Sequence, residues 1–548
     1  MEECNNNRGE SSSRSIQQQQ HSPSFRRRES KGNSNAQFTW IGSNRLVSWL
    51  ILITLWAYLG FFVQSKWEDY EKEQELKGFD FHLRNHQDLV IKKSSLLVYN
   101  EKVGLNNHNY MDVVLAKKGE NVLIFHELSM TGAPLSIMEL ATELMSCGAN
   151  VSAVVLSKKG GLMQELIRKK IKVIDDKVDH SFKAARKADL VIAGSAVCSS
   201  WIEQYIEYFP SGASKVVWWI MENRREYFDC SKHVLNKVKM LVFLSESQSK
   251  KWQKWYKEEN RRLRFQPGIV PLSVNDELAY AAGIHSSSAS NKINEKRKFF
   301  RETVRKELGL NDNDMLVISL SSINPGKGQL LFLESANSVI ENESFQEHDK
   351  KNQNSSQVTL ARRYHIRKLL PMLKDSNSIS SNSGKKKQSL KILIGSVGSK
   401  SNEVDYVKSM ISLLSQHSNL SKSVLWTPAT THVASLYSVA DVYVINSQGS
   451  GETFGRVTIE AMAFGLPVLG TDAGGTKEIV EHNVTGLHHP IGRKGNHILA
   501  KNIRFLLENR FAREKMGMKG RKKVQRMYLK QHMYSKFVEV LVRSMRSK

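Results

Sequence analysis

The chain has 548 residues, 40% of them hydrophobic, and a formal net charge of +26 at pH 7. This length excludes a single compact domain and predicts two or more globular cores. The four cysteines have no metal-binding spacing and are too few for a disulfide scaffold. Because no zinc or RNA-binding motif accompanies the positive charge, we expect no nucleic-acid partner, and anionic lipid or an acidic polysaccharide remains to explain it.

The N-terminal region predicts a membrane anchor. Residues 1–44 are polar and of low complexity, which is typical of a disordered tail. Residues 46–63, LVSWLILITLWAYLGFFV, carry no charge and are just long enough to cross a bilayer. Arginines precede this run and acidic residues follow it, so the positive-inside rule places the tail in the cytosol and the remainder in a lumen. We therefore expect a transmembrane signal anchor at 45–64 and a stem at 65–118, the alternative being a cleaved signal peptide.

The next segment predicts a first Rossmann-like half over residues 119–270. Asn121–Phe125 (NVLIF) has the composition of a buried strand, Gly132 follows in a loop, and Leu135–Cys147 has helical spacing. Further apolar runs alternate with helical stretches, as expected for a parallel sheet. The sequon at Asn150, with four others at Asn342, Asn354, Asn419 and Asn483, agrees with a luminal glycoprotein.

A second half is predicted over residues 271–525. Residues 281–301 are polar and basic and are interpreted as an inserted loop. Met315–Leu320 predicts the first strand of this half, and Lys327 follows between two glycines, where an ammonium could contact phosphate. Residues 341–388 form a low-complexity insertion, and 526–548 a final helix expected to pack back on the first half.

The most informative stretch is residues 441–487, which predicts strand, Gly-rich loop, helix, strand, Gly-rich loop, helix. Glu452 lies in the first Gly-rich loop and Glu460 lies in the following helix. Loop glycines and a helix N-terminus suit phosphate, and carboxylates accept hydrogen bonds from sugar and ribose hydroxyls. The pattern favours a nucleotide-sugar cradle, with the alternative that Glu460 is a solvated helix residue and Glu452 a cap.

The same stretch resembles the donor-binding signature of retaining GT-B glycosyltransferases, the large family that includes sucrose synthases and bacterial mannosyltransferases. The matching pieces are Glu452, Glu460, Gly465-Leu466-Pro467-Val468, Gly474-Gly475 and Glu478. The resemblance implies an α/β fold of the GT-B class, with two Rossmann-like domains facing a cleft. It also implies sugar transfer from a nucleotide donor, with UDP ahead of GDP, and neither a cofactor nor a metal.

The resemblance assigns roles to individual residues. Glu452 would hold the donor sugar as the catalytic residue, Glu460 would bind the ribose, and Lys327 the diphosphate. The donor site would be completed by the loop containing Gly132, by Arg456, and by the backbone amides of Thr453, Phe454 and Gly455.

Two positions depart from the family pattern. Ser322 stands where the family usually has an arginine, and Met221 stands where many members have a histidine. Arg456 is the candidate to compensate for the missing arginine, whereas His126 lies elsewhere in the pattern. We expect a glycosyltransferase of the Golgi membrane, single-pass with a luminal catalytic part, acting on a glycan or polysaccharide. The alternatives are a catalytically silent module that supports a partner enzyme and a basic polyanion-binding protein.

Overall fold

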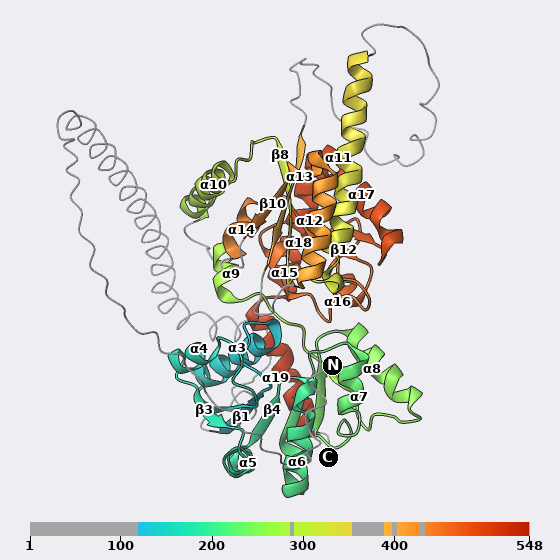
Figure 1. Ribbon diagram of the computed structural model, residues 1–548. Helices are drawn as coiled ribbons and strands as arrows, with labels where there is room; N and C mark the ends of the chain where they lie inside the picture. Colours follow the sequence, from blue (N-terminus) through green and yellow to red (C-terminus); the bar gives the residue numbers. More distant parts are fainter. Residues whose placement is uncertain (1–118, 285–289, 353–387, 397–402, 428–432, 547–548) are drawn as a thin grey trace, which may run out of the picture. The chain divides into compact units, whose positions relative to one another are not determined.

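A computed structural model describes residues 119–284, 290–352, 388–396, 403–427 and 433–546 (Figure 1). Every described residue belongs to one compact unit, Asn106–Lys548. The predicted tail, transmembrane anchor and stem lie outside the described residues, as does most of the predicted insertion. Among the helices that are described, none combines the length and apolar character needed to cross a bilayer.

The first half is built on a seven-stranded, all-parallel sheet in the order β3-β2-β1-β4-β5-β6-β7. Its strands are β1 Glu120–Phe125, β2 Asn150–Val155, β3 Lys172–Asp175, β4 Leu190–Ala193, β5 Val216–Trp219, β6 Met240–Phe243 and β7 Gly268–Ile269. The strand order reverses between β1 and β4, which is where open α/β sheets bind ligands. The predicted Rossmann-like half is confirmed.

Helices cover both faces of this sheet (Figure 1). They are α3 Gly132–Ser146, α4 Met163–Arg168, α5 Val178–Lys187, α6 Ser199–Tyr208, α7 Arg225–Ser231 and α8 Glu246–Glu258, with 3-10 turns η1 Ala196–Cys198 and η2 Pro210–Lys215. Successive side chains of a strand point to opposite faces. Accordingly Leu123 and Phe125 of β1 belong to one hydrophobic cluster and Ile124 to another. Continuous apolar runs in the sequence thus reflect a sheet that is buried on both sides.

The second half repeats this arrangement with a six-stranded parallel sheet in the order β10-β9-β8-β11-β12-β13. Its strands are β8 Asp314–Leu320, β9 Ser389–Gly395, β10 Val424–Thr427, β11 Val442–Ile445, β12 Val468–Thr471 and β13 Gly486–His489. The order reverses between β8 and β11. The prediction of a second parallel α/β half is confirmed, with Val442–Ile445 as predicted.

The helices of this half, in chain order, are α9 Asp276–Ala281, α10 Ser290–Glu307, α11 Gln329–Asn352, α12 Val404–Gln416, α13 Ser418–Ser421, α14 Val433–Val439, α15 Arg456–Ala463, α16 Gly474–Ile479, α17 Arg493–Glu508 and α18 Arg510–Met527. The 3-10 turn η3, Pro325–Lys327, precedes α11. Helix α11 extends to Asn352 and therefore includes the first residues of the insertion predicted from residue 341.

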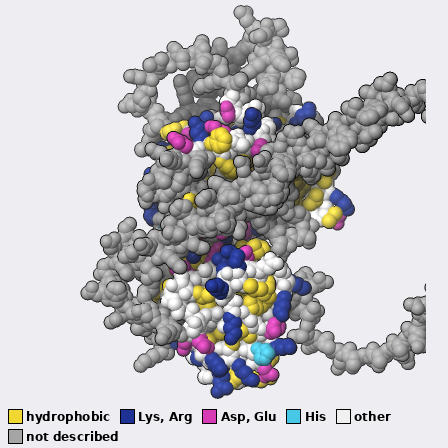
Figure 2. All heavy atoms as spheres, turned by 90° about the vertical axis from the view of Figure 1, so that its left-hand side faces the viewer, with side chains coloured by type: hydrophobic (Ala, Val, Ile, Leu, Met, Phe, Trp, Pro, Cys, Tyr) yellow, Lys and Arg dark blue, Asp and Glu magenta, His cyan; other side chains and the backbone are white. Residues whose placement is uncertain are grey.

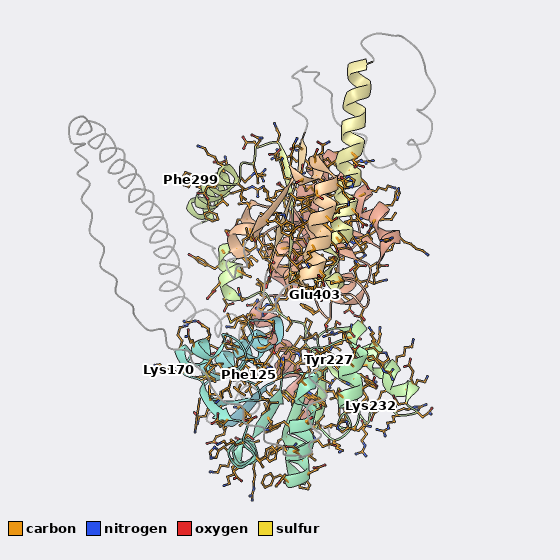
Figure 3. The ribbon with its side chains drawn as sticks, in the orientation of Figure 1. Phe125, Lys170, Tyr227, Lys232, Phe299 and Glu403 are labelled. Carbon is orange, nitrogen blue, oxygen red and sulfur yellow. The ribbon has the colours of Figure 1, made fainter. Side chains whose placement is uncertain are left out.

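The prediction of an inserted loop at 281–301 is wrong over its second part, where α10 forms. Arg301 Nη2 lies 2.7 Å from Asp441 Oδ1, and Arg305 Nη1 lies 3.2 Å from Asp441 Oδ2. Both guanidinium groups also donate to backbone carbonyls near the start of β11. Phe299 of the same helix is 72% exposed and points outward (Figure 3). The helix is therefore held by polar contacts, which an apolar-periodicity search does not detect.

The last helix, α19 Lys530–Arg546, packs against the first half. The Phe537 ring lies 5.3 Å from that of Trp219, and Arg543 donates to the carbonyl of Gln266 at 3.1 Å. A Cβ added to Gly268 would come within 2.7 Å of the Val540 side chain, so the glycine lets the helix approach β7 closely. The C-terminal helix thus follows the second half in sequence but packs against the sheet of the first half.

Charged side chains of both signs lie on the part of the surface that is visible from one side (Figure 2). In the view of Figure 2, Lys and Arg side chains are interspersed with Asp, Glu and hydrophobic side chains. Several cations of the first half are paired: Lys232 binds Glu259 at 2.9 Å, and Arg225 binds Glu258 at 2.8 Å.

Candidate functional site

The candidate site lies at the carboxyl ends of β8 and β11, the neighbouring strands between which the second sheet reverses its order. Lys327 ends the 3-10 turn after β8, and Glu452 lies in the loop after β11. Lys327 Nζ is 2.5 Å from Glu452 Oε1, although the residues are 125 positions apart. The structure thus brings together two of the predicted site residues at the place where parallel α/β sheets bind ligands.

Hydrogen bonds between the two loops fix this pair. The Asn446 side-chain amide donates to the Gly328 carbonyl at 2.9 Å, and the Gln448 N–H donates to the Gly326 carbonyl at 2.8 Å. Gly328 adopts φ 65°, and a Cβ there would lie 2.3 Å from the Asn446 carbonyl. Glycine is therefore required after Lys327 for both conformational and steric reasons.

Glu452 is held in its charged form. Its side chain is 19% exposed, and it also accepts a hydrogen bond from the Ser447 hydroxyl. Burial by itself raises the pKa of Glu452, but the Lys327 ammonium and the Ser447 hydroxyl outweigh it, so the pKa lies below its ordinary value. The site thus pairs one fixed carboxylate with one ammonium, and both remain partly accessible.

The glycine pair 474–475 supports the Glu452 loop by close backbone contact. The Gly475 N–H donates to the Glu452 carbonyl at 2.8 Å. A Cβ on Gly475 would lie 2.3 Å from the Phe454 carbonyl oxygen, and one on Gly474 would lie 2.2 Å from the Glu452 carbonyl oxygen. Real Cβ atoms do not approach so closely, so these glycines set the position of the loop.

Glu478, the last piece of the signature, has a different setting. Its carboxylate accepts from the N–H groups of Glu246 (3.1 Å) and Ser247 (2.6 Å), at the start of α8. A carboxylate is stabilising at a helix N-terminus because it satisfies free N–H groups and opposes the helix dipole. Glu478 therefore joins the two halves.

The three residues after Glu452 lead into α15. The Thr453 carbonyl accepts from the Ser245 hydroxyl at 3.1 Å, and Phe454 is buried with its ring 6.0 Å from Tyr528. Gly455 occupies the N-cap with φ 99°, so no side chain caps the first N–H groups of α15. Those N–H groups are suited to an anionic group.

Arg456 and Glu460 form one buried cluster. Arg456 Nη2 is 2.6 Å from Glu139 Oε1 on α3, and its Nε is 3.3 Å from Glu460 Oε1. The Tyr437 hydroxyl donates to Glu460 Oε2 at 3.1 Å. Burial raises the pKa of Glu460, while Arg456 and Tyr437 oppose that rise. Glu460 is only 8% exposed, so it is not a solvated helix residue.

Gly132 is the first residue of α3, whose N-cap Thr131 makes no side-chain capping bond. No heavy atom lies within 4 Å of a Cβ placed on Gly132, so open space adjoins the helix N-terminus. Arg456 contacts the same helix through Ser136 and Glu139. Helices α3 and α15, which carry predicted site residues of the two halves, are therefore in direct contact.

The two departures from the family pattern have clear structural settings. The Ser322 carbonyl accepts from the Gln329 side chain, and Met221 is buried. The adjacent Glu222 carboxylate accepts from the Ser195 hydroxyl (2.5 Å) and the Ala196 N–H (2.8 Å), which fixes the loop after β4. His126 lies elsewhere, 3.8 Å from Glu127. The Arg456 guanidinium, the predicted substitute for the missing arginine, is paired with Glu139 and Glu460.

Sequence reasoning missed Ser447, Asn446 and Glu139. The first two directly follow strand β11, so their place at the carboxyl end of a parallel strand was a usable signal. Nothing in the sequence around Glu139 links it to Arg456. Within the described ranges, no group of three or more His, Cys, Asp and Glu side chains is arranged to hold a metal ion.

Two protein families match this chain. Residues 117–287 match the family described as Glycosyl-transferase family 4, and residues 368–523 match Glycosyl transferases group 1. Sucrose synthase 2 of Pisum sativum is 35% identical over 95 residues, which is 16% of this chain and 11% of that protein. N-acetyl-alpha-D-glucosaminyl L-malate synthase of Bacillus anthracis is 30% identical over 114 residues, or 21% of this chain and 29% of that protein. The matched regions thus span under a third of these relatives.

Solved structures extend the likeness over most of the described chain. HepE from Anabaena in complex with UDP has a TM-score of 0.56 at 16% identity and covers 77% of this chain and 100% of its own. Sucrose-phosphate synthase from Thermosynechococcus elongatus has a TM-score of 0.53 at 16% identity, covering 79% and 100%. At these identities the likeness establishes a shared fold.

Proposed function

Because this chain is a GT4-type member of the GT-B glycosyltransferase family, we propose that it transfers a sugar from a UDP-sugar to a glycan or polysaccharide acceptor. The observation that carries the proposal is the Lys327–Glu452 pair at the β8/β11 reversal point, 2.5 Å apart. A nucleotide sugar requires a cation that binds its phosphates and a carboxylate that accepts from its hydroxyls, and this pair supplies both groups. HepE, which has a similar fold, was solved in complex with UDP, and this supports the choice of uracil as the donor base.

In the proposed reaction, Glu452 holds the donor sugar and remains ionised. Burial raises the pKa of Glu452, but the neighbouring Lys327 and Ser447 outweigh burial and the pKa is lowered overall. Lys327 binds the diphosphate and keeps only part of its contact with Glu452. The negative charge of the diphosphate is also balanced by the N-terminal N–H groups of α15. Glu460 binds the ribose, and Arg456 orients its carboxylate. The transfer proceeds with retention of anomeric configuration and uses no metal.

We place the reaction in the Golgi lumen, with the chain anchored by residues 45–64. The uncharged run 46–63, preceded by arginines and followed by acidic residues, supports this placement. A second candidate is a catalytically silent module that binds a nucleotide sugar for a partner enzyme. Ser322 and Met221, at the positions of the family's arginine and histidine, favour that candidate.

The test is calorimetric titration of the full chain with UDP and GDP, followed by an assay of UDP-sugar turnover. We expect UDP binding that Glu460→Ala abolishes. Glu452→Ala should still bind UDP but no longer favour the UDP-sugar over UDP. Nucleotide binding without turnover of any UDP-sugar selects the silent module. If neither nucleotide binds, the assignment of the donor site is wrong.

A further inference from the structure

A second charged pocket lies away from the candidate donor site. It is formed by α18 and by the turn that precedes β13, and its lining residues are Glu481, Val484, Thr485, Lys519, Lys522, Lys523 and Arg526. The turn ends at Gly486, which pairs with Val468, the first residue of β12. The pocket therefore adjoins the amino ends of the strands, whereas Lys327 and Glu452 follow carboxyl ends.

The charge of α18 is strongly unbalanced. The helix contains eight Lys and Arg residues and a single acidic residue, Glu514. Arg510 pairs with Glu514, while Arg513 and Arg521 donate to backbone carbonyls in the packed interior. These three cations thus serve the fold of the second half.

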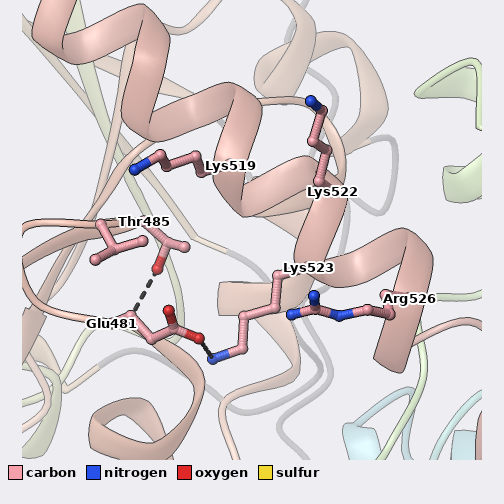
Figure 4. A pocket seen from close by; sticks show the side chains of 7 residues that line it. Glu481, Thr485, Lys519, Lys522, Lys523 and Arg526 are labelled. Carbon is pink, nitrogen blue, oxygen red and sulfur yellow. Dashed lines mark hydrogen bonds and ion pairs between the residues drawn. The ribbon is translucent and has the colours of Figure 1, made fainter.

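Glu481 is the only carboxylate among the lining residues of the pocket, and it is already paired with Lys523. Lys523 Nζ is 2.7 Å from Glu481 Oε1, and its side chain is only 8% exposed. Lys519 and Arg526 are directed toward the same turn, and Lys522 points away from it at the rim (Figure 4). Within the described part of the chain, no carboxylate forms an ion pair with any of these three cations.

This arrangement favours binding of an anion. Lys519, Lys522 and Arg526 are spaced three and four residues apart, so they lie close together on one side of the helix and repel one another. The pocket encloses about 200 Å³, several times the roughly 30 Å³ that one water molecule occupies. It has room for a charged group larger than a simple ion.

We propose that this pocket binds an acidic sugar residue of a polysaccharide, with Arg526 and Lys519 on its anionic group and Lys522 at the rim. Guanidinium and ammonium groups donate charge-assisted hydrogen bonds to carboxylate or sulfate. The pocket lies at the amino ends of the strands, whereas the donor loops lie at the carboxyl ends. It therefore holds a part of the polysaccharide that is distant from the donor site. The proposal does not depend on the donor-site assignment.

The lining favours a sugar over the other polyanions. Single-stranded nucleic acid is bound by stacking on aromatic side chains, and none lines the pocket. Membrane-binding helices insert large apolar side chains, whereas the only aliphatic lining residue is Val484. The exposed apolar residues of α18, Phe511, Met518 and Met527, are not among the lining residues.

The test is titration of the full chain with a trimer of uronic acid residues and with the neutral trimer of the same linkage. We expect the acidic trimer to bind and the neutral trimer not to bind. The triple variant Lys519→Ala, Lys522→Ala, Arg526→Ala should lose affinity about tenfold or more, as expected for lost charge-assisted bonds. UDP affinity should be unchanged in this variant, which separates the outcome from that of the donor site.

A matched control removes the same charge elsewhere. Lys183, Lys187 and Lys254 are exposed on α5 and α8, and their triple alanine variant should keep the affinity for the acidic trimer. Glu481→Gln removes the only carboxylate of the pocket and should raise that affinity. Equal losses in the two triple variants, or equal binding of both trimers, overturn the proposal. So does binding to phosphatidylserine vesicles, lost in the pocket variant, without binding of the acidic trimer.

Discussion

Arg456 Nη2 lies 2.6 Å from Glu139 Oε1, and this ion pair joins helix α15 of the second half to helix α3 of the first. The two side chains are only 11% and 18% exposed. The same guanidinium contacts Glu460, which we propose binds the ribose. The proposed ribose-binding residue is thereby tied, through Arg456, to the opposite half of the chain.

Glu139→Gln should lower the free energy of unfolding by about 1–3 kcal/mol, because Arg456 loses a buried charged partner. Thermal unfolding of the full chain measures this change. The matched control is Glu203→Gln, whose exposed pairs with His233 and Lys237 should contribute less than about 1 kcal/mol. Equal destabilisation by the two variants would show that the bridge between α3 and α15 is not special.

Lys327→Ala should weaken binding of UDP by about tenfold or more, because it removes the ammonium proposed to bind the diphosphate. Binding of uridine, which has no phosphate, should change little. Calorimetry with both ligands makes the comparison. Lys477→Ala serves as the control, since Lys477 is 59% exposed and pairs with Asp472. A parallel loss of uridine binding would point to a collapsed site instead of a lost phosphate contact.

Gly475→Ala should destabilise the second half by about 1–3 kcal/mol, because its Cβ would overlap the Phe454 carbonyl at 2.3 Å. Displacement of the loop should also reduce donor affinity. Gly161→Ala provides the control, since the nearest atom to its Cβ is 3.9 Å away. Thermal unfolding and UDP titration of both variants test the steric role, which an unchanged Gly475→Ala protein would refute.

His489 predicts a loss of stability in acid. The His489 side chain is buried and hydrogen-bonds to Asn446 at 2.9 Å. Burial and, to a smaller extent, the neighbouring His488 lower the pKa of His489 to about 4. The unfolded chain binds a proton near pH 6.5 and the folded chain does not, so stability is present above that pH. It falls as pH drops from about 6.5 toward 4, by about 3 kcal/mol in all.

Unfolding measured at pH 7 and at pH 4.5 checks this prediction. His489→Gln should show a smaller difference between the two pH values than the parent chain. His180→Gln, at an exposed position on α5, should leave the difference unchanged. A parent-like pH dependence in His489→Gln would assign the acid sensitivity to other groups.

Much of the fold follows from local patterns. Apolar runs such as Val442–Ile445 predict strands because parallel strands are buried on both faces, and Gly465 with Pro467 predicts the end of α15. The region of α10 escaped prediction because Arg301 and Arg305 stabilise it through Asp441, a residue remote in sequence. Ion pairs of that kind leave no periodic signal.

The sequence by itself determined the two parallel α/β halves and the residue types of the candidate site, because periodicity, glycines and a spaced pair of glutamates are local features. Only the tertiary structure decided which side chains meet. It paired Lys327 with Glu452, assigned Arg456 to Glu139 and Glu460, and placed Glu478 on the N-terminus of α8. Apart from the pair of Arg456 and Glu460 on one helix, these contacts depend on strand order and on the packing of helices from both halves, which bring together residues more than a hundred positions apart.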